Sequence, residues 1–135
     1  MTGLMLASES GHLNIVRLLL QNGANVEARD GNGSTALLLA CLEGHVQLAA
    51  SGGFEACVSF LLERGASPSA TSKGGRTALH WAARHGDWGV CQLLLAGGAD
   101  PSAEDKRGLS PLALARRQHH RQCATLLLQA EQAQE

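Results

Sequence analysis

The sequence contains almost no aromatic side chains: they make up 3% of its 135 residues, and tyrosine is absent. Globular β-domains rely on aromatic and β-branched residues in alternating runs, so this scarcity argues against an all-β fold. Hydrophobic residues still account for 44% of the chain, which is enough to build one core. Because leucine, alanine and glycine dominate, the composition predicts packed helices with aliphatic layers.

A strong charge excess, paired cysteines and long apolar runs are also missing. The formal net charge is -1, whereas general nucleic-acid and membrane binders carry a clear basic excess. None of the four cysteines belongs to a CxxC pair, and each lies in an apolar helical stretch, as expected of a reduced cytoplasmic or nuclear protein. No apolar run approaches about 18 residues, and no secretion signal is visible, so we expect neither a membrane span nor export.

An internal repeat organises what is present. Similar segments begin at Thr2, Thr35, Thr77 and Ser110, and they read TGLMLA, TALLLA, TALHWA and SPLALA. The first two segments start 33 residues apart, as do the last two, whereas the middle interval is 42 residues, which is 33 plus nine. The extra residues fall at about 44–52, between the two predicted helices of the second unit.

The pattern within each unit predicts two helices and a turn. Threonine or serine begins the first helix as an N-cap, and Pro111 suits the first helical position. The second helix carries apolar residues at i, i+3 and i+4 spacing, for example Val16, Leu19 and Leu20. Glycines then end these helices, and Gly-rich segments such as 72–75 supply turns between units.

The 33-residue period, Thr-Ala-Leu-His-Trp-Ala-Ala at 77–83 and the later Leu-Leu-Leu-x-x-Gly-Ala are similar to the ankyrin-repeat family. The resemblance implies an all-α solenoid of four helix-turn-helix repeats joined by β-hairpin-like fingers. We place the repeats at about 1–29, 30–71, 72–104 and 105–130, which makes one domain over 1–130. Residues 131–135 are expected to form a polar tail.

The two end repeats differ. The fourth has Arg116 and Arg117 where the third has Ala83 and Arg84, and it resembles a polar C-terminal cap. The first carries Leu13, Ile15 and other apolar residues with no polar replacement. The sequence therefore predicts an uncapped face, which belongs either to a fragment or isoform of a longer array or to a self-associating chain.

Metal binding and catalysis have little support in the sequence. His119, His120 and Cys123 share a helical face, but no second cluster completes the four ligands that zinc prefers. The resemblance gives His80 a structural role in tying turns together. We find no nucleophile with a base, no paired carboxylates and no phosphate-binding loop, and we expect no enzyme activity, cofactor or small-molecule substrate.

Members of the family bind proteins along the concave face formed by the fingers and first helices. Eight basic and four acidic residues lie in 71–130, against three and six in 1–70, so the basic excess falls on repeats three and four. We therefore predict that a protein segment of net acidic or mixed charge is bound near Trp81 and Leu109 within a positive rim. The alternative is a structural or spacer role in a longer array, or a substrate-adaptor fragment with contacts elsewhere. Carried over by repeat position, the candidate residues are Asn32, Lys73, Arg76, Trp81, Arg84, His85, Lys106, Arg107, Leu109 and Arg117.

Overall fold

The structure is a computed structural model that describes residues 2–10, 12–43 and 51–133. Within these ranges the regular secondary structure is entirely helical, which confirms the predicted all-α solenoid. The helices form four pairs in chain order: α1 (Gly3–Glu9) with α2 (Leu13–Gln21), α3 (Ala36–Glu43) with α4 (Ser51–Glu63), α5 (Ala78–His85) with α6 (Trp88–Ala96), and α7 (Pro111–Arg117) with α8 (Arg121–Ala133).

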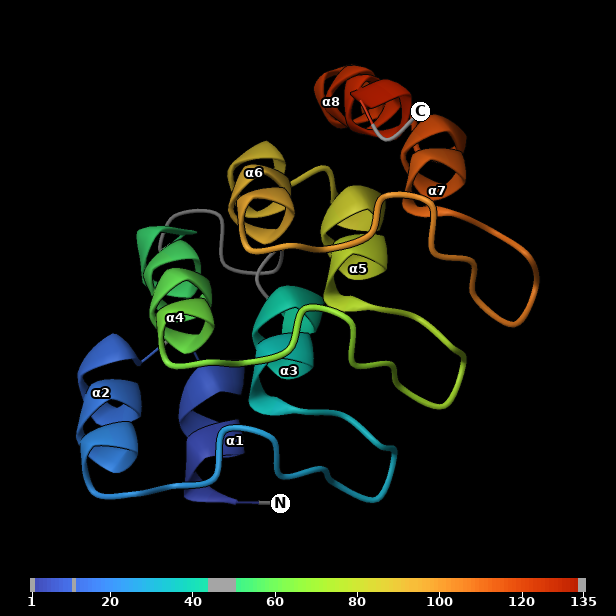
Figure 1. The fold of residues 1–135 in the computed structure, drawn as a ribbon. Coiled ribbons are helices and arrows are strands. Elements are labelled where there is room, and N and C mark those ends of the chain that lie inside the picture. The colour runs from blue at the N-terminus through green and yellow to red at the C-terminus, as the bar shows by residue number, and fades with distance from the viewer. Residues whose placement is uncertain (1, 11, 44–50, 134–135) are drawn as a thin grey trace.

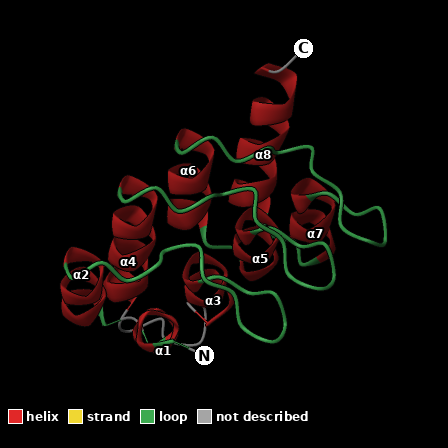
Figure 2. Cartoon of the chain, turned by 60° about the horizontal axis from the view of Figure 1, so that its bottom comes forward, coloured by secondary structure: helices red, strands yellow, loops and turns green. Residues whose placement is uncertain are grey.

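The pairs stack into two rows (Figure 1). Helices α1, α3, α5 and α7 form the inner row, and α2, α4, α6 and α8 form the outer row, each packing against the next helix of its own row. The three loops that join one pair to the next project together beyond the inner row (Figure 2). This arrangement is that of a solenoid in which each repeat packs against its neighbours.

Each inner helix begins with the predicted cap. A side-chain hydroxyl accepts a hydrogen bond from the backbone N–H three residues further on, over 3.2–3.4 Å. This bond satisfies one of the N–H groups that lack a partner at a helix start. The four caps are Thr2, Thr35, Thr77 and Ser110.

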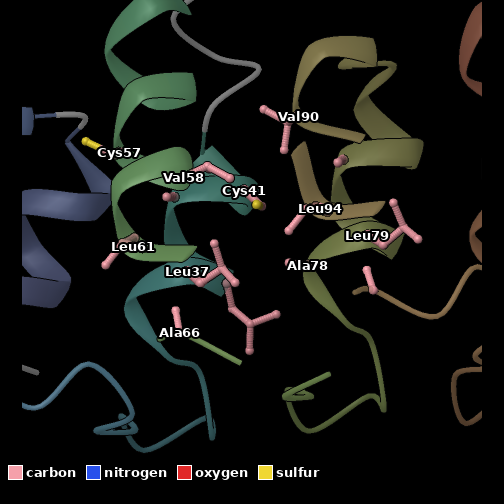
Figure 3. Close-up of a cluster of buried hydrophobic side chains, with 14 of the residues drawn as sticks. Leu37, Cys41, Cys57, Val58, Leu61, Ala66, Ala78, Leu79, Val90 and Leu94 are labelled. Carbon is pink, nitrogen blue, oxygen red and sulfur yellow. The ribbon is translucent and has the colours of Figure 1, made fainter. Parts of the chain in front are cut away.

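The core lies between the rows and runs through all four repeats. Leucines supply its bulk, including Leu37, Leu61 and Leu94, while alanines such as Ala78 allow close packing of the inner helices (Figure 3). All of these side chains are buried. Burying one such leucine contributes about 2 kcal/mol, so the stack gains stability from each repeat that it adds.

Two boundaries differ from the sequence-based ones. Helix α4 begins at Ser51, inside the expected insertion at 44–52, while residues 44–50 lie outside the described part of the chain. Helix α8 extends to Ala133, three residues past the expected domain end at 130. The reason is physical: alanine, glutamate and glutamine are good helix formers, and neither glycine nor proline ends the helix there.

The two ends of the stack expose different surfaces. Leu6, Ile15 and Leu18 of the first repeat are 55%, 48% and 59% exposed. The residue at the position of Leu6 in the second repeat, Leu39, is 7% exposed, and the residue at the position of Ile15 in the third, Val90, is 3% exposed. In the fourth repeat, the polar residues 116–119, at the end of α7 and just before α8, are exposed. The first repeat thus leaves uncovered the apolar positions that a preceding repeat covers elsewhere in the stack.

Candidate partner-binding face

The three loops share one turn, and we call them fingers 1, 2 and 3 (residues 30–34, 72–76 and 105–109). In each finger the first residue donates its N–H to the carbonyl oxygen of the last, over 2.9–3.0 Å. The fourth residue is a glycine with φ between +75° and +79°, a region that side chains with a Cβ rarely adopt. We call the side formed by the fingers and inner helices the concave face.

Neighbouring fingers are joined through their backbones. The N–H of Lys73 donates to the carbonyl oxygen of Asn32 over 3.2 Å, and that of Lys106 donates to Gly74 over 3.0 Å. These bonds hold the finger tips in a row along the concave face, so basic residues at successive tips lie next to one another.

Finger 2 lacks an acceptor that its neighbours have. In finger 1 an Asp30 carboxylate oxygen accepts the N–H groups of residues 32 and 34, and in finger 3 an Asp105 oxygen accepts those of residues 107 and 109. Ser72 stands at this position in finger 2. No described residue accepts a hydrogen bond from the N–H of Gly74 or Arg76.

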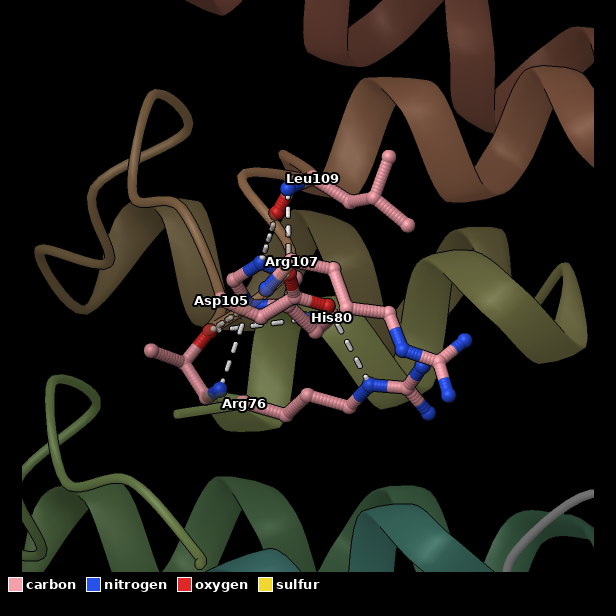
Figure 4. Close-up of polar contacts among 6 residues, drawn as sticks. Arg76, His80, Asp105, Arg107 and Leu109 are labelled. Carbon is pink, nitrogen blue, oxygen red and sulfur yellow. Dashed lines mark hydrogen bonds and ion pairs between the residues drawn. The ribbon is translucent and has the colours of Figure 1, made fainter. Parts of the chain in front are cut away.

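Asp105 links fingers 2 and 3 through its second oxygen (Figure 4). The Nε–H of Arg76 donates to it over 3.4 Å, and the aspartate side chain is only 1% exposed. Burial opposes ionisation of this carboxyl group, but the N–H groups of Leu109 and Arg107 and the Arg76 guanidinium outweigh it and lower its pKa. Asp105 therefore stays charged and fully engaged, and it anchors Arg76.

His80 joins the same network from α5 (Figure 4). Its Nδ1 accepts the N–H of Thr77 over 3.1 Å, and its Nε2–H donates to the carbonyl oxygen of Leu109 over 2.8 Å. Burial lowers the pKa of this imidazole, so the ring is neutral. His80 thus ties the start of α5 to the end of finger 3, which agrees with its expected structural role.

Trp81 carries two guanidinium groups on its ring. Arg76 lies 5.0 Å and Arg84 lies 5.6 Å from the ring centroid, and the His85 ring stacks on it at 6.1 Å. The indole is half-buried and packs against the core. Cation–π attraction of this kind contributes about 0.5–1 kcal/mol at exposed sites. Trp81 therefore positions two cations and leaves little bare apolar surface.

A pocket of about 320 Å³ opens between fingers 2 and 3. It contains four of the predicted residues, namely Arg76, Trp81, Lys106 and Arg107, while Arg84 and His85 flank it through Trp81. Lys73, Arg84, Lys106 and Arg107 form no ion pair with any residue that the structure describes. The pocket lining also includes Ser72, Gly74 and Asp105.

The other predicted residues lie apart from this pocket. Asn32 is exposed at the tip of finger 1, Arg117 is exposed on α7, and Leu109 contributes mainly its backbone groups. Asp105, which also lines the pocket, is not among the residues predicted from the sequence. The signal for it was the shared Asp-x-x-Gly spacing of residues 30–33 and 105–108, which finger 2 breaks at Ser72.

The four cysteines lie in the core, and His120 links the third and fourth repeats. All four cysteines are buried and free, burial raises the pKa of the Cys57 thiol to about 11, and contact with Cys123 together with burial raises that of Cys91. Cys57 and Cys91 are thus held as thiols, which are poor nucleophiles and metal ligands, while the hydrogen bond with Cys91 lowers the pKa of Cys123. The His120 Nε2–H donates to the carbonyl oxygen of Arg84 over 3.0 Å. No group of three His, Cys, Asp or Glu residues within the described ranges is placed to hold a metal ion.

In the described ranges, no helix has both the length and the apolar character needed to cross a bilayer. Stacked helix pairs with hydrogen-bonded fingers define a helical repeat protein. A family model described as "Ankyrin repeats (3 copies)" matches residues 46–135, and one described as "Ankyrin repeats (many copies)" matches residues 4–50. The chain belongs to the ankyrin-repeat family. Ankyrin repeats are non-catalytic modules that generally bind other proteins.

Three curated proteins resemble part of the chain. The probable E3 ubiquitin-protein ligase XBOS33 of Oryza sativa subsp. japonica and the E3 ubiquitin-protein ligase XBAT33 of Arabidopsis thaliana are each 54% identical over 39 residues, 29% of this chain and 8% of theirs. The ankyrin repeat and KH domain-containing protein mask-1 of Caenorhabditis elegans is 45% identical over 49 residues, 36% of this chain and 2% of its own. The chain thus spans a small part of each.

Proposed function

We propose that this chain is a non-catalytic interaction module that binds an extended, acidic or mixed-charge protein segment on the concave face of repeats two to four. The observation that supports this proposal most strongly is the group of cations without ion-pair partners along fingers 2 and 3 and α5: Lys73, Arg84, Lys106 and Arg107. Surface charges of one sign that lack partners within the protein favour a ligand of the opposite sign.

The arrangement of the fingers suits an extended ligand. The backbone bonds from Lys73 and Lys106 to the preceding finger fix the spacing of the tips, so their charges form a row. Trp81 holds Arg76 and Arg84 against its ring, which reduces the side-chain entropy that these residues lose on binding. Binding is then steered by charge and weakens as salt is added.

The test reverses charge at two residues whose side chains form no hydrogen bond or ion pair with the described residues. Lys106 and Arg107 are exposed, and the structure assigns their side chains no internal bond, so the double variant Lys106→Glu/Arg107→Glu preserves the fold. Arg76 and Trp81 are less suitable, because removing Arg76 leaves the buried Asp105 carboxylate without its cation.

Affinity capture from cell extract followed by mass spectrometry first names the partner, and titration of the purified partner then measures the effect. We expect the double variant to bind at least tenfold more weakly, while the control Arg121→Glu, which is exposed on α8, binds like the wild type. Equal affinities of the double variant and the wild type would refute the concave-face assignment.

A second function, as part of a longer ankyrin array, is favoured by the exposed Leu6, Ile15 and Leu18. At the equivalent positions of the later repeats, a preceding repeat covers the side chain. The relatives that the chain matches are much longer than the matched segments, and two are named as E3 ubiquitin-protein ligases, which fits a substrate-adaptor role. In this proposal the first repeat packs against another repeat, either in the same polypeptide or in a second copy.

Fusing a copy of residues 77–109 directly before Thr2 tests the array proposal. These 33 residues add one near-consensus repeat and its finger in register. We expect the melting temperature to rise and amide exchange in α1 and α2 to slow, because the added repeat buries the three apolar side chains. Unchanged exchange in α1 would count against it. Sedimentation of the unmodified chain separately tests self-association, which a strict monomer at all concentrations would exclude.

A further inference from the structure

The pocket between fingers 2 and 3 has more positive charge than its own acidic group neutralises. Arg76, Lys106 and Arg107 line it, against the single carboxylate of Asp105, which leaves a formal balance of +2. Asp105 already accepts two backbone N–H groups and the Arg76 Nε–H, and its side chain is 1% exposed. The positive charge in the pocket is therefore available to a ligand.

The guanidinium groups of Arg76 and Arg107 extend to the same side of the Asp105 carboxylate (Figure 4). Both residues line the one pocket, and each guanidinium is a planar donor suited to two oxygens of a phosphate or carboxylate. The ammonium group of Lys106 adds a third cation from the same finger as Arg107. Together these groups offer more hydrogen-bond donors than the two oxygens of a single carboxylate can accept, so a ligand with more oxygens is better matched to the pocket.

Backbone donors add to these cations. Gly74 and Arg76 line the pocket, and their N–H groups have no acceptor within the described residues because Ser72 replaces the aspartate of fingers 1 and 3. In finger 3 the equivalent N–H groups are satisfied by a carboxylate oxygen. Finger 2 thus keeps two donors that its neighbours use internally.

Apolar recognition fits this pocket poorly. Trp81 is its aromatic wall, and the guanidinium groups of Arg76 and Arg84 lie over that ring. A volume of about 320 Å³ matches the lower end of small-ligand sites, which is more than a bare carboxylate fills.

We propose that this pocket receives a phosphorylated serine or threonine side chain of the bound protein segment. A phosphorylated side chain carries a charge of about -1.5 to -2 at neutral pH, which matches the local balance of +2, whereas one aspartate or glutamate leaves a cation unmatched. Its three terminal oxygens accept from Arg107, Lys106 and the Arg76 guanidinium. This proposal rests on the proposed binding of a segment to the concave face and names the chemistry of its anchor.

Three matched peptides test the proposal. Each is an acetylated, amidated five-residue peptide of alanines with phosphoserine, glutamate or serine at the centre. They are titrated into the full chain carrying Trp88→Phe, so that Trp81 is the only tryptophan and its fluorescence reports occupancy of the pocket. Trp88 is 45% exposed on α6 and is not part of this pocket.

We expect the phosphoserine peptide to bind about tenfold more tightly than the glutamate peptide, and the serine peptide to bind not at all. Arg107→Gln and Lys106→Gln should each weaken phosphoserine binding by about tenfold, and the control Arg121→Gln should not change it. A ten-nucleotide oligothymidylate is titrated in parallel to detect general recognition of phosphate by a nucleic-acid site.

Equal binding of the glutamate and phosphoserine peptides overturns the proposal, as does tighter binding of the oligonucleotide or an equal effect of Arg121→Gln. If phosphoserine is not preferred but Lys106→Glu/Arg107→Glu still weakens the captured partner, only the phosphorylated anchor is wrong. If that double variant binds the partner normally, the proposed function itself fails.

Discussion

Replacing His80 measures what the link between α5 and finger 3 contributes to stability. The ring is fully buried and is hydrogen-bonded at both nitrogens: Nδ1 accepts from the N–H and the hydroxyl of Thr77, and Nε2–H donates to the carbonyl oxygen of Leu109. His80→Ala removes the bonds at both ring nitrogens and leaves a cavity. His80→Leu removes the bonds but fills most of the space, as Leu38 does at the same position of the second repeat.

The expected magnitudes follow from these contacts. Losing the hydrogen bonding at each of the two ring nitrogens costs about 1 kcal/mol net, and the cavity left by a large-to-alanine change adds about 2 kcal/mol. His80→Ala should therefore lower the free energy of unfolding by about 4 kcal/mol, and His80→Leu by about 2 kcal/mol. Small domains are stable by only about 5–15 kcal/mol, so both changes are large.

Urea unfolding followed by circular dichroism at 222 nm measures the two values. Leu38→Ala is the matched control, because it removes a buried side chain at the same repeat position without breaking a side-chain hydrogen bond. If His80→Leu unfolds at the same urea concentration as the wild type, the hydrogen bonds of the imidazole contribute nothing. If the alanine and leucine variants are equal, the cavity estimate fails.

The pKa of His80 predicts a pH dependence of the same link. Because burial lowers the pKa of His80, the unfolded chain binds more protons than the folded chain below about pH 6.5, so stability should fall as the pH drops below that value. Urea titrations between pH 7 and 5 measure this fall, which should be smaller in His80→Leu. Two glycines test backbone strain: Gly86→Ala and Gly23→Ala both place alanine at positive φ, but only at Gly86 does the new Cβ collide with a histidine ring. Thermal unfolding should show a loss of about 1 kcal/mol at Gly23 and clearly more at Gly86; equal losses would show that the ring moves aside freely. Finally, Leu6→Lys should change stability by less than about 0.5 kcal/mol, whereas Leu39→Lys at the same position of the second repeat should cost about 3 kcal/mol or more. If urea unfolding gives similar midpoints for the two variants, Leu6 is covered in solution.

The repeat architecture could be predicted from the sequence because it is determined by interactions between residues close together in the chain. The hydroxyls of Thr2 and Thr77 cap helices through bonds that span three residues, and the apolar face of each outer helix follows from i, i+3 and i+4 spacing. Four copies in register make these signals reinforce one another. The continuation of α8 past residue 130 also has a local cause. The sequence did not predict it, because the polar residues after 130 are equally compatible with an exposed helix and with an irregular tail.

The pocket depended on contacts between residues far apart in the chain. Arg76 and Asp105 are 29 residues apart, and nothing near either residue specifies that the guanidinium of one finger reaches the carboxylate of the next. The sequence placed Trp81 among basic residues, but stacking of the repeats decided that Arg76 and Arg84 lie over its ring. In the same way, the sequence showed that Ser72 breaks the Asp-x-x-Gly pattern, and only the finger geometry showed which two N–H groups are left without an acceptor. Local bonds and periodicity thus determined the four repeats, whereas the side chains that meet between fingers were decided by the tertiary structure, because those contacts depend on how one repeat is placed against the next.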